Sequence, residues 1–188
     1  MKKLNLLIII LSFNLGFSQT KPEISLLLDE ISETENSIYL TNTRQASKII
    51  DYGDKSLSIL TDYFTDTTLT KVKSECQKRV LTKGDIAIIL ADTIKRMHYF
   101  QLTGIQNCLA SFCENNPNLI EYYLWAIEKN GREKFQKKYR DWIYWEKLSD
   151  KEKKKITREN KRKYRKQKRE AKNQQVTRAI INAVSIAS

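Results

Sequence analysis

The 188-residue chain has little glycine and little proline, with five and two residues respectively. Folds made of many short strands need turns rich in these residues, and phosphate-binding loops need closely spaced glycines, so both are excluded. In place of turn residues, the sequence has apolar residues that recur every three or four positions. This period predicts an all-α fold, built either as stacked helical hairpins or as an irregular helical bundle.

Residues typical of catalysis are also sparse, and no catalytic motif is present. The single histidine, His98, follows an apolar helix without a matching nucleophile, so we expect it to make a structural hydrogen bond. Asp85 and Asp92 share one side of that helix, as paired glycosidase carboxylates might. The favoured interpretation is that Asp85 caps the helix and that Asp92 makes hydrogen bonds or pairs with a nearby arginine such as Arg96. No catalytic residue, metal site or cofactor is therefore predicted.

Three cysteines are present, Cys76, Cys108 and Cys113, and a zinc site built from them with His98 would have no CxxC or HxxxH pair. Cys108 and Cys113 are five residues apart on an expected helix, about 140° around its axis, so they do not bridge each other. A disulfide from Cys76 to either one stays open. The odd count favours the alternative that all three are small, buried, apolar side chains.

The N-terminus has the pattern of a secretory signal peptide. Lys2 and Lys3 precede a mostly apolar stretch over residues 4–17, and Gly16 and Ser18 are small residues before a cleavage point. The stretch is shorter than the roughly 20 apolar residues that a membrane-spanning helix needs. We therefore expect residues 1–18 to be removed, the protein to be periplasmic or secreted, and a helical domain to follow over residues 19–148.

Capping and turn residues divide this domain into helices. We expect helices after Pro22, over 44–66 as a pair, over 70–81, from Thr82 to about residue 96, from Thr103 or Gly104 onward, from Pro117 to Gly131, and from Arg132 to Leu148. The helix after Thr82 is apolar on nearly every side from Ile86 to Ala91, so it is predicted to be buried at the centre.

Residues 44–66 hold the clearest local pattern, two short amphipathic helices joined at a glycine. The residues that carry it are Ala46, Ile49, Gly53, Leu57, Leu60 and Asp66. They stand where HEAT-like and armadillo-like α-helical repeats place small, apolar, turn and terminal residues, and the segment resembles those repeats. Later pairs are expected to begin near residues 70 and 103. The resemblance implies a right-handed stack of helix pairs with a concave binding face, and no chemistry.

Positive charge is confined to one end of the chain. The net charge is +12, yet residues 1–131 carry 14 basic and 15 acidic residues, while residues 132–178 carry 20 and 7. A capping-box pattern at Ser149 and Glu152 predicts a long basic helical tail over residues 149–188. Its candidate contacts to an anionic partner are Lys153, Lys154, Lys155, Arg158, Lys161, Arg162, Lys163, Arg165, Lys166, Lys168 and Arg169.

Two further features flank the basic run. Tyr144 and Trp145 lie partly off the apolar stripe of the preceding helix, beside cations, and are a candidate stacking surface. From Val176 to Ala187, apolar residues recur at i, i+3 and i+4. This amphipathic end is too short to span a bilayer, but it can dock on the body, pair with another chain or enter a membrane interface.

Three functions are compatible with these sequence features. The favoured one is an exported, non-enzymatic helical-repeat protein whose tail contacts an envelope lipid, a polyanionic glycan or an acidic protein, including peripheral contact with a membrane. The alternative is a nucleic-acid-binding protein, because each Lys or Arg that neutralises a phosphate adds affinity. Export removes the usual nucleic-acid partners and leaves extracellular nucleic acid as the remaining one. The third is an enzyme whose site is not visible in the sequence.

Overall fold

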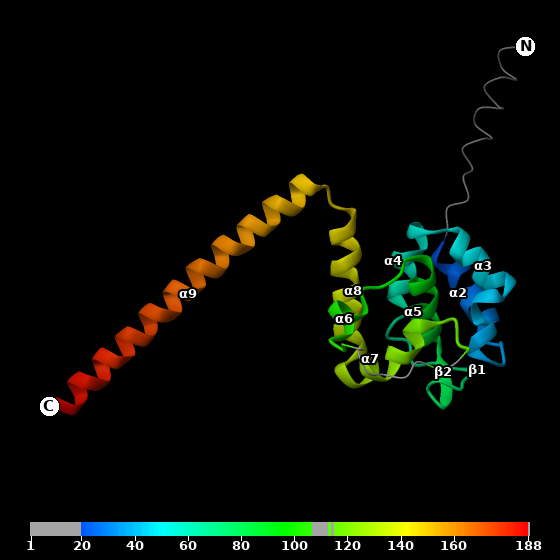
Figure 1. Cartoon of the computed structure of the whole chain (residues 1–188), viewed down its shortest axis with the longest axis horizontal. Coiled ribbons are helices and arrows are strands. Elements are labelled where there is room, and N and C mark those ends of the chain that lie inside the picture. Colours follow the sequence, from blue (N-terminus) through cyan, green and yellow to red (C-terminus); the bar gives the residue numbers. More distant parts are fainter. Residues whose placement is uncertain (1–19, 107–112, 114, 188) are drawn as a thin grey trace, which may run out of the picture. The chain divides into compact units, whose positions relative to one another are not determined.

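Helices make up most of the chain in the computed structural model, which describes residues 20–106, 113 and 115–187 (Figure 1). The predicted signal peptide, residues 1–18, lies outside the described residues. The chain divides into two units, residues 1–141 and 142–188, and the boundary falls within a helix. The predominantly helical fold predicted from the sequence is confirmed.

In chain order, the elements of the first unit are α2 (Lys21–Ile31), the 3-10 helix η1 (Ser37–Asn42), α3 (Arg44–Asp51), α4 (Asp54–Asp62), β1 (Leu69–Ser74), β2 (Arg79–Thr82), α5 (Lys83–Ile94), α6 (Tyr99–Thr103), the 3-10 helix η2 (Leu119–Tyr123), α7 (Leu124–Asn130) and most of α8 (Arg132–Lys147). The second unit contains the last turns of α8 and the helix α9 (Asp150–Ala187).

Helices α2, α3 and α4 follow the sequence prediction closely. Thr20 caps α2 by accepting a hydrogen bond from the Glu23 N–H, and the apolar side of α2 is buried from Ile24 to Ile31. Between α3 and α4 the chain turns at Gly53, whose φ of 58° favours glycine. The predicted inner residues of this pair, Ala46, Ile49, Leu57 and Leu60, are buried.

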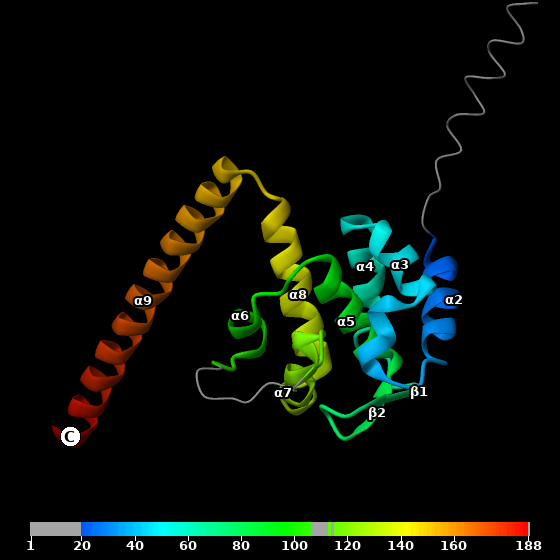
Figure 2. The ribbon, with the colours of Figure 1, turned by 45° about the vertical axis from the view of Figure 1, so that its right-hand side comes forward.

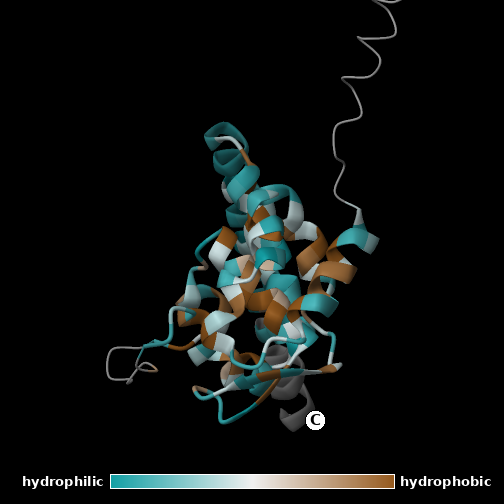
Figure 3. Ribbon diagram, turned by 90° about the vertical axis from the view of Figure 1, so that its right-hand side faces the viewer, coloured by the Kyte–Doolittle hydropathy of each residue, from teal (hydrophilic) through white to brown (hydrophobic). Residues whose placement is uncertain are grey.

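Helix α5 is the buried central helix that the sequence predicts. The Thr82 hydroxyl accepts a hydrogen bond from the Asp85 N–H, and the Asp85 carboxylate accepts one from the Thr82 N–H, which completes the capping box. Every residue from Lys83 to Asp92 is buried. The helix packs against α3, α4, η1 and η2. In Figure 3, the residues coloured brown as hydrophobic gather within this unit.

The helix expected over residues 70–81 is wrong, because this stretch forms an antiparallel hairpin of β1 and β2 (Figure 2). Val72 and Ser74 are buried and alternate with exposed Lys71 and Lys73, which is the period of a strand. The outer edge of β1 is also paired, because the N–H groups of Lys71 and Lys73 donate to the carbonyls of Ser32 and Glu35. These long-range bonds favour the strand over the local helical pattern.

The expected helix from Thr103 or Gly104 onward is also displaced. Helix α6 ends at Thr103, and Gly104, with φ of 78°, closes it in the left-handed conformation. The remaining positions of that prediction, residues 107–112, lie outside the described residues. Pro117 does not begin a helix, since helical structure resumes as a 3-10 turn at Leu119. Helix α8 has the predicted extent to within one residue.

The expectation of three unpaired cysteines is wrong. Cys76, in the turn between β1 and β2, forms a disulfide with Cys113, with Cα atoms 5.4 Å apart. The bond links the hairpin to the segment that precedes η2, across a sequence separation of 37 residues. The cross-link stabilises this unit chiefly by restricting the unfolded chain.

Candidate functional site

The buried acid Asp85 is engaged in structural bonds on both carboxylate oxygens. Arg79 Nη1 donates to Oδ2 at 2.7 Å, and Arg132 Nη2 donates to Oδ1 at 2.7 Å. Burial alone would raise the pKa of Asp85, but the bonds and charges of these two guanidinium groups outweigh it and hold the pKa below its ordinary value. The ionised carboxylate, bonded on both oxygens, joins α5, β2 and α8.

Asp92 lies in a separate hydrogen-bond network of the same helix. Its Oδ1 accepts the Met97 N–H at 2.7 Å, and its Oδ2 accepts the Tyr99 hydroxyl at 2.9 Å. Arg96 Nη1 lies 3.5 Å from Oδ2, which confirms the predicted ion pair. Burial raises the pKa of Asp92 against the effect of these bonds. The carboxylate serves to close the end of α5, and it is not paired with Asp85 in glycosidase fashion.

His98 and Glu121 are likewise held by neighbouring polar groups. His98 precedes α6, and its Nδ1 lies 3.3 Å from Gln101 Oε1, which agrees with the structural role predicted for it.

Glu121 is fully buried, and it accepts hydrogen bonds from the Ser37 and Ser74 hydroxyls on Oε1 and from Asn116 Nδ2 on Oε2. The sequence did not predict this network, which joins η1, β1 and η2.

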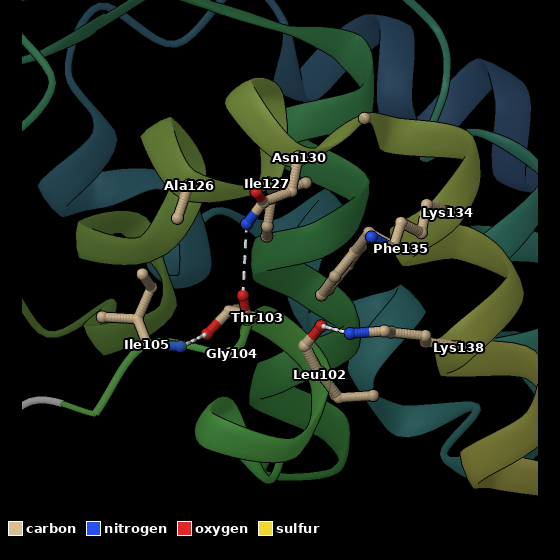
Figure 4. A pocket seen from close by; sticks show the side chains of 11 residues that line it. Leu102, Thr103, Gly104, Ile105, Ala126, Ile127, Asn130, Lys134, Phe135 and Lys138 are labelled. Atoms are coloured by element: carbon tan, nitrogen blue, oxygen red, sulfur yellow. Dashed lines mark hydrogen bonds between the residues drawn. The ribbon is translucent and has the colours of Figure 1, made fainter.

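A cavity of about 360 Å³ opens between α6, α7 and α8 (Figure 4). Two polar side chains of its lining connect the helices around it. Lys138 Nζ on α8 donates to the Leu102 carbonyl of α6 at 3.2 Å, and Asn130 Nδ2 on α7 donates to the Thr103 carbonyl of α6 at 3.3 Å. Apolar side chains, including Phe135 and Ile127, form much of the rest of its lining. The described residues that line this cavity include no carboxylate, histidine or cysteine.

The basic helix α9 begins as the sequence predicts. The Ser149 hydroxyl accepts a hydrogen bond of 3.4 Å from the Glu152 N–H, and the Ser149 N–H donates to Glu152 Oε2 at 2.9 Å. From Asp150 the helix continues without interruption to Ala187. The register of its residues is therefore fixed from one end to the other.

The positive charges of α9 lie on one side of the helix. With about 100° between successive residues, all the positions within a sector of about 160° between residues 151 and 172 are Lys or Arg. We name these eleven residues the cationic stripe: Lys151, Lys154, Lys155, Arg158, Lys161, Arg162, Arg165, Lys166, Lys168, Arg169 and Lys172. The stripe is about 31 Å long at the rise of an α-helix.

The opposite side of α9 has a different composition. It contains Glu152, Glu159 and Glu170 with only two cations, Lys153 and Lys163. Its other residues are Ile156, Thr157, Asn160, Tyr164, Gln167 and Ala171. The structure therefore brings together nine of the eleven predicted site residues, places Lys153 and Lys163 elsewhere, and adds Lys151 and Lys172. A helical projection of the sequence contained this signal.

The cationic stripe is accessible and largely unneutralised by its own helix. All eleven of its side chains are exposed. Over residues 150–175, whose side chains are described, 13 Lys and Arg stand against four Asp and Glu, a net charge of +9. Within that stretch one ion pair occurs, between Lys166 Nζ and Glu170 Oε1 at 3.9 Å. The stripe is thus a surface with a large excess of positive charge.

The two residues of the predicted stacking surface lie near the end of α8. The side chain of Tyr144 is 63% exposed, and that of Trp145 is 36% exposed. In the described part of the chain, cations lie over the ring of Tyr63, from Lys21 and Lys83, and not over these two rings. Both remain available to an external ring or sugar.

Residues 176–187 continue the helix, while their side-chain surroundings lie outside the description. Among the residues that the structure describes, no helix has the length and apolar character needed to cross a bilayer. No group of three His, Cys, Asp or Glu side chains that could hold a metal ion occurs in the described ranges. Comparison of the chain with protein-family models, curated proteins and solved structures found no match.

Proposed function

We propose that the chain is an exported, non-enzymatic, helical-repeat-like protein whose helix α9 binds an anionic partner, namely an envelope lipid, a polyanionic glycan or an acidic protein. The cationic stripe is the observation that carries this proposal. Its eleven exposed cations lie on one side of a single helix and repel one another in water. A partner with negative charges on its surface relieves this repulsion and releases counterions, both of which favour binding.

The disulfide supports the exported location. Structural disulfides form and persist in oxidising compartments, whereas cytosolic thiols are kept reduced. The bond between Cys76 and Cys113 therefore fits a protein that leaves the cytoplasm, as the signal-peptide pattern of residues 1–18 predicts.

The α3–α4 hairpin supports the repeat-like description of the body. Its two short helices each bury one side, and they turn at Gly53 as the resemblance to HEAT-like repeats implies. A body of this kind offers a packed scaffold, and the exposed charge for attraction to a partner is supplied by α9.

Deleting residues 149–188 tests this function. The mature chain, beginning at residue 19, and the truncated chain would each be used to capture material from a cell-envelope fraction, and each would be titrated with heparin, duplex DNA and anionic vesicles. We expect the mature chain to bind and the truncated chain, still folded, to lose binding. A mature chain that binds none of the three polyanions contradicts the proposal. A strong preference for DNA selects the nucleic-acid alternative.

Charge-matched variants separate the stripe from the total charge. The double variant Lys154→Gln/Lys161→Gln removes two cations from the stripe, whereas Lys153→Gln/Lys163→Gln removes two from the opposite side. Both variants lose the same charge and the same residue type. We expect the first pair to weaken binding several-fold more than the second, because only stripe cations meet the partner together. Equal losses would show that the arrangement on the helix has no role.

A further inference from the structure

The two ends of helix α9 share one side, although their chemistry differs. The helix is continuous from Asp150 to Ala187. Eighteen residues make about five complete turns, so a residue and its successor 18 positions later occupy the same side of an α-helix. The cationic stripe can therefore be followed beyond Lys172 by comparing positions that are 18 residues apart.

Each stripe cation with a successor in the final segment is followed by an apolar residue. The pairs are Arg158 and Val176, Lys161 and Ala179, Arg162 and Ile180, Arg165 and Ala183, Lys166 and Val184, Lys168 and Ile186, and Arg169 and Ala187. On the opposite side, the successors of Glu159, Asn160, Tyr164 and Gln167 are Thr177, Arg178, Asn182 and Ser185. The one apolar residue there is Ile181. The cationic stripe thus continues, on the same side of the helix, as an apolar stripe over residues 176–187.

This order of chemistry separates an anionic bilayer from a polyanionic glycan and from a nucleic acid. A polyanionic glycan or a nucleic acid offers charge to the cationic stripe, but it offers no apolar layer beside that charge. An anionic bilayer offers both, because its phosphate layer lies directly outside its acyl chains. Within the cationic stripe no apolar side chain interrupts the charge, so that part of α9 is suited to the headgroups. The apolar stripe is too short to span and is suited to the boundary below them.

We infer that the anionic partner of α9 is the surface of a phospholipid bilayer, with the cationic stripe on the lipid phosphates and residues 176–187 inserted into the interface on the same side. This inference rests on the proposed function, and it selects one of the partners named there. It requires one side of α9 to make both contacts at once, so the position of the apolar residues around the helix matters as well as their number.

A permutation that conserves composition tests this arrangement. The variant Ile180→Asn/Asn182→Ile/Val184→Ser/Ser185→Val moves two apolar residues off the stripe side and changes neither charge nor content. The unaltered mature chain and this variant would be titrated with phosphatidylcholine vesicles containing about one third phosphatidylglycerol, and separately with heparin. We expect the variant to lose about tenfold or more in vesicle affinity, since burying one large aliphatic side chain is worth about that factor. Its heparin affinity should stay unchanged.

The outcomes separate this inference from the function on which it rests. If the unaltered chain binds neither vesicles nor heparin, the proposed function fails. If it binds both and the permuted variant binds vesicles equally well, the proposed function stands and the bilayer inference is overturned. A variant that keeps vesicle affinity but unfolds at lower temperature also overturns it, because the apolar end then docks on the protein. A vesicle-specific loss with an unchanged melting temperature supports it.

Discussion

Arg132 Nη2 donates a hydrogen bond of 2.7 Å to Asp85 Oδ1 in the interior of the first unit, and both side chains are buried. The same guanidinium donates from Nη1 to the Phe64 carbonyl at 3.2 Å and from Nε to Glu128 at 2.6 Å. One side chain at the start of α8 therefore bonds to α5, to α7 and to the segment that follows α4. These bonds fix α8 against the central helix.

Replacing Arg132 with Met should destabilise the protein by about 3–5 kcal/mol, because it leaves the Asp85 carboxylate and the Phe64 carbonyl buried with fewer partners. Urea unfolding measures this loss. The matched control is Arg140→Met on the same helix, since Arg140 is half exposed and pairs with Asp62 at the surface. That change should cost less than about 1 kcal/mol. Similar losses in both variants would contradict a structural role for the Arg132–Asp85 pair.

The same pair predicts an acid-sensitive component of stability. The folded protein holds the pKa of Asp85 below its ordinary value of 3.8, because its two Arg partners outweigh the effect of burial. Its stabilising contribution is therefore complete above pH 3.8 and is lost as the pH falls below that value through the folded pKa. The free energy of unfolding of Asp85→Asn, measured across acidic pH, should fall less steeply on acidification than that of the unaltered chain.

Asp92 provides the control of opposite sign. Burial raises its pKa above 3.8, so the folded state binds a proton more readily than the unfolded state does. The stabilising contribution of protonated Asp92 to folding is then lost as the pH rises from 3.8 through the raised pKa. Asp92→Asn should remove that decline and leave the acid loss due to Asp85 in place. A variant that behaves like Asp85→Asn would show that the two carboxylates act as one group.

Local signals in the sequence predicted the elements that depend on near neighbours. Thr82 with Asp85, Gly53 and Ser149 each mark a helix end through bonds within a few residues, and the structure has a helix end at each of them. The failures involve distant partners. Val72 and Val80 fit a helical period and a strand equally well until the pairing of β1 with the chain near Ser32 is known. The cationic stripe shows the same dependence on sequence distance. Its residues lie close together on one helix, so the sequence predicted most of them, whereas Asp85 and Phe64, two partners of Arg132, are distant from it in the sequence and were not predicted.

The disulfide should make a large contribution to stability. Closing a loop of 37 residues restricts the unfolded chain by an amount equivalent to about 4 kcal/mol. Replacing both Cys76 and Cys113 with Ser, or reducing the protein, should lower the free energy of unfolding by up to this value. Alkylation of the denatured protein without reductant should modify one thiol of the three cysteines, and three after reduction. Three reactive thiols before reduction would contradict the bond.

Gly84 should tolerate no side chain, because α5 begins close to the chain that leaves α4. A Cβ atom there would lie 2.7 Å from the Asp66 carbonyl oxygen and 2.8 Å from that of Phe64. Gly84→Ala should therefore cost about 1–3 kcal/mol through overpacking. Gly104→Asn is the control, since Gly104 has open space around it and a left-handed conformation that Asn accepts. A neutral Gly84→Ala, measured by urea unfolding, would contradict this close approach.

Salt should increase the helix content of α9. Neighbours on the cationic stripe, such as Lys154 and Arg158 or Arg158 and Arg162, are like charges at i, i+4 and repel one another. Raising the salt from about 10 mM to about 500 mM shortens the screening length from about 30 Å to below 8 Å and weakens this repulsion. Circular dichroism of the chain from residue 19 onward should show a gain in helix signal that is absent when residues 149–188 are deleted. The variant Lys154→Gln/Lys161→Gln/Lys168→Gln, which removes one row of the stripe, should gain less. A helix signal that does not respond to salt in the chain from residue 19 onward would mean that the cations of the stripe do not repel one another measurably. A partner could then gain no binding energy by relieving that repulsion.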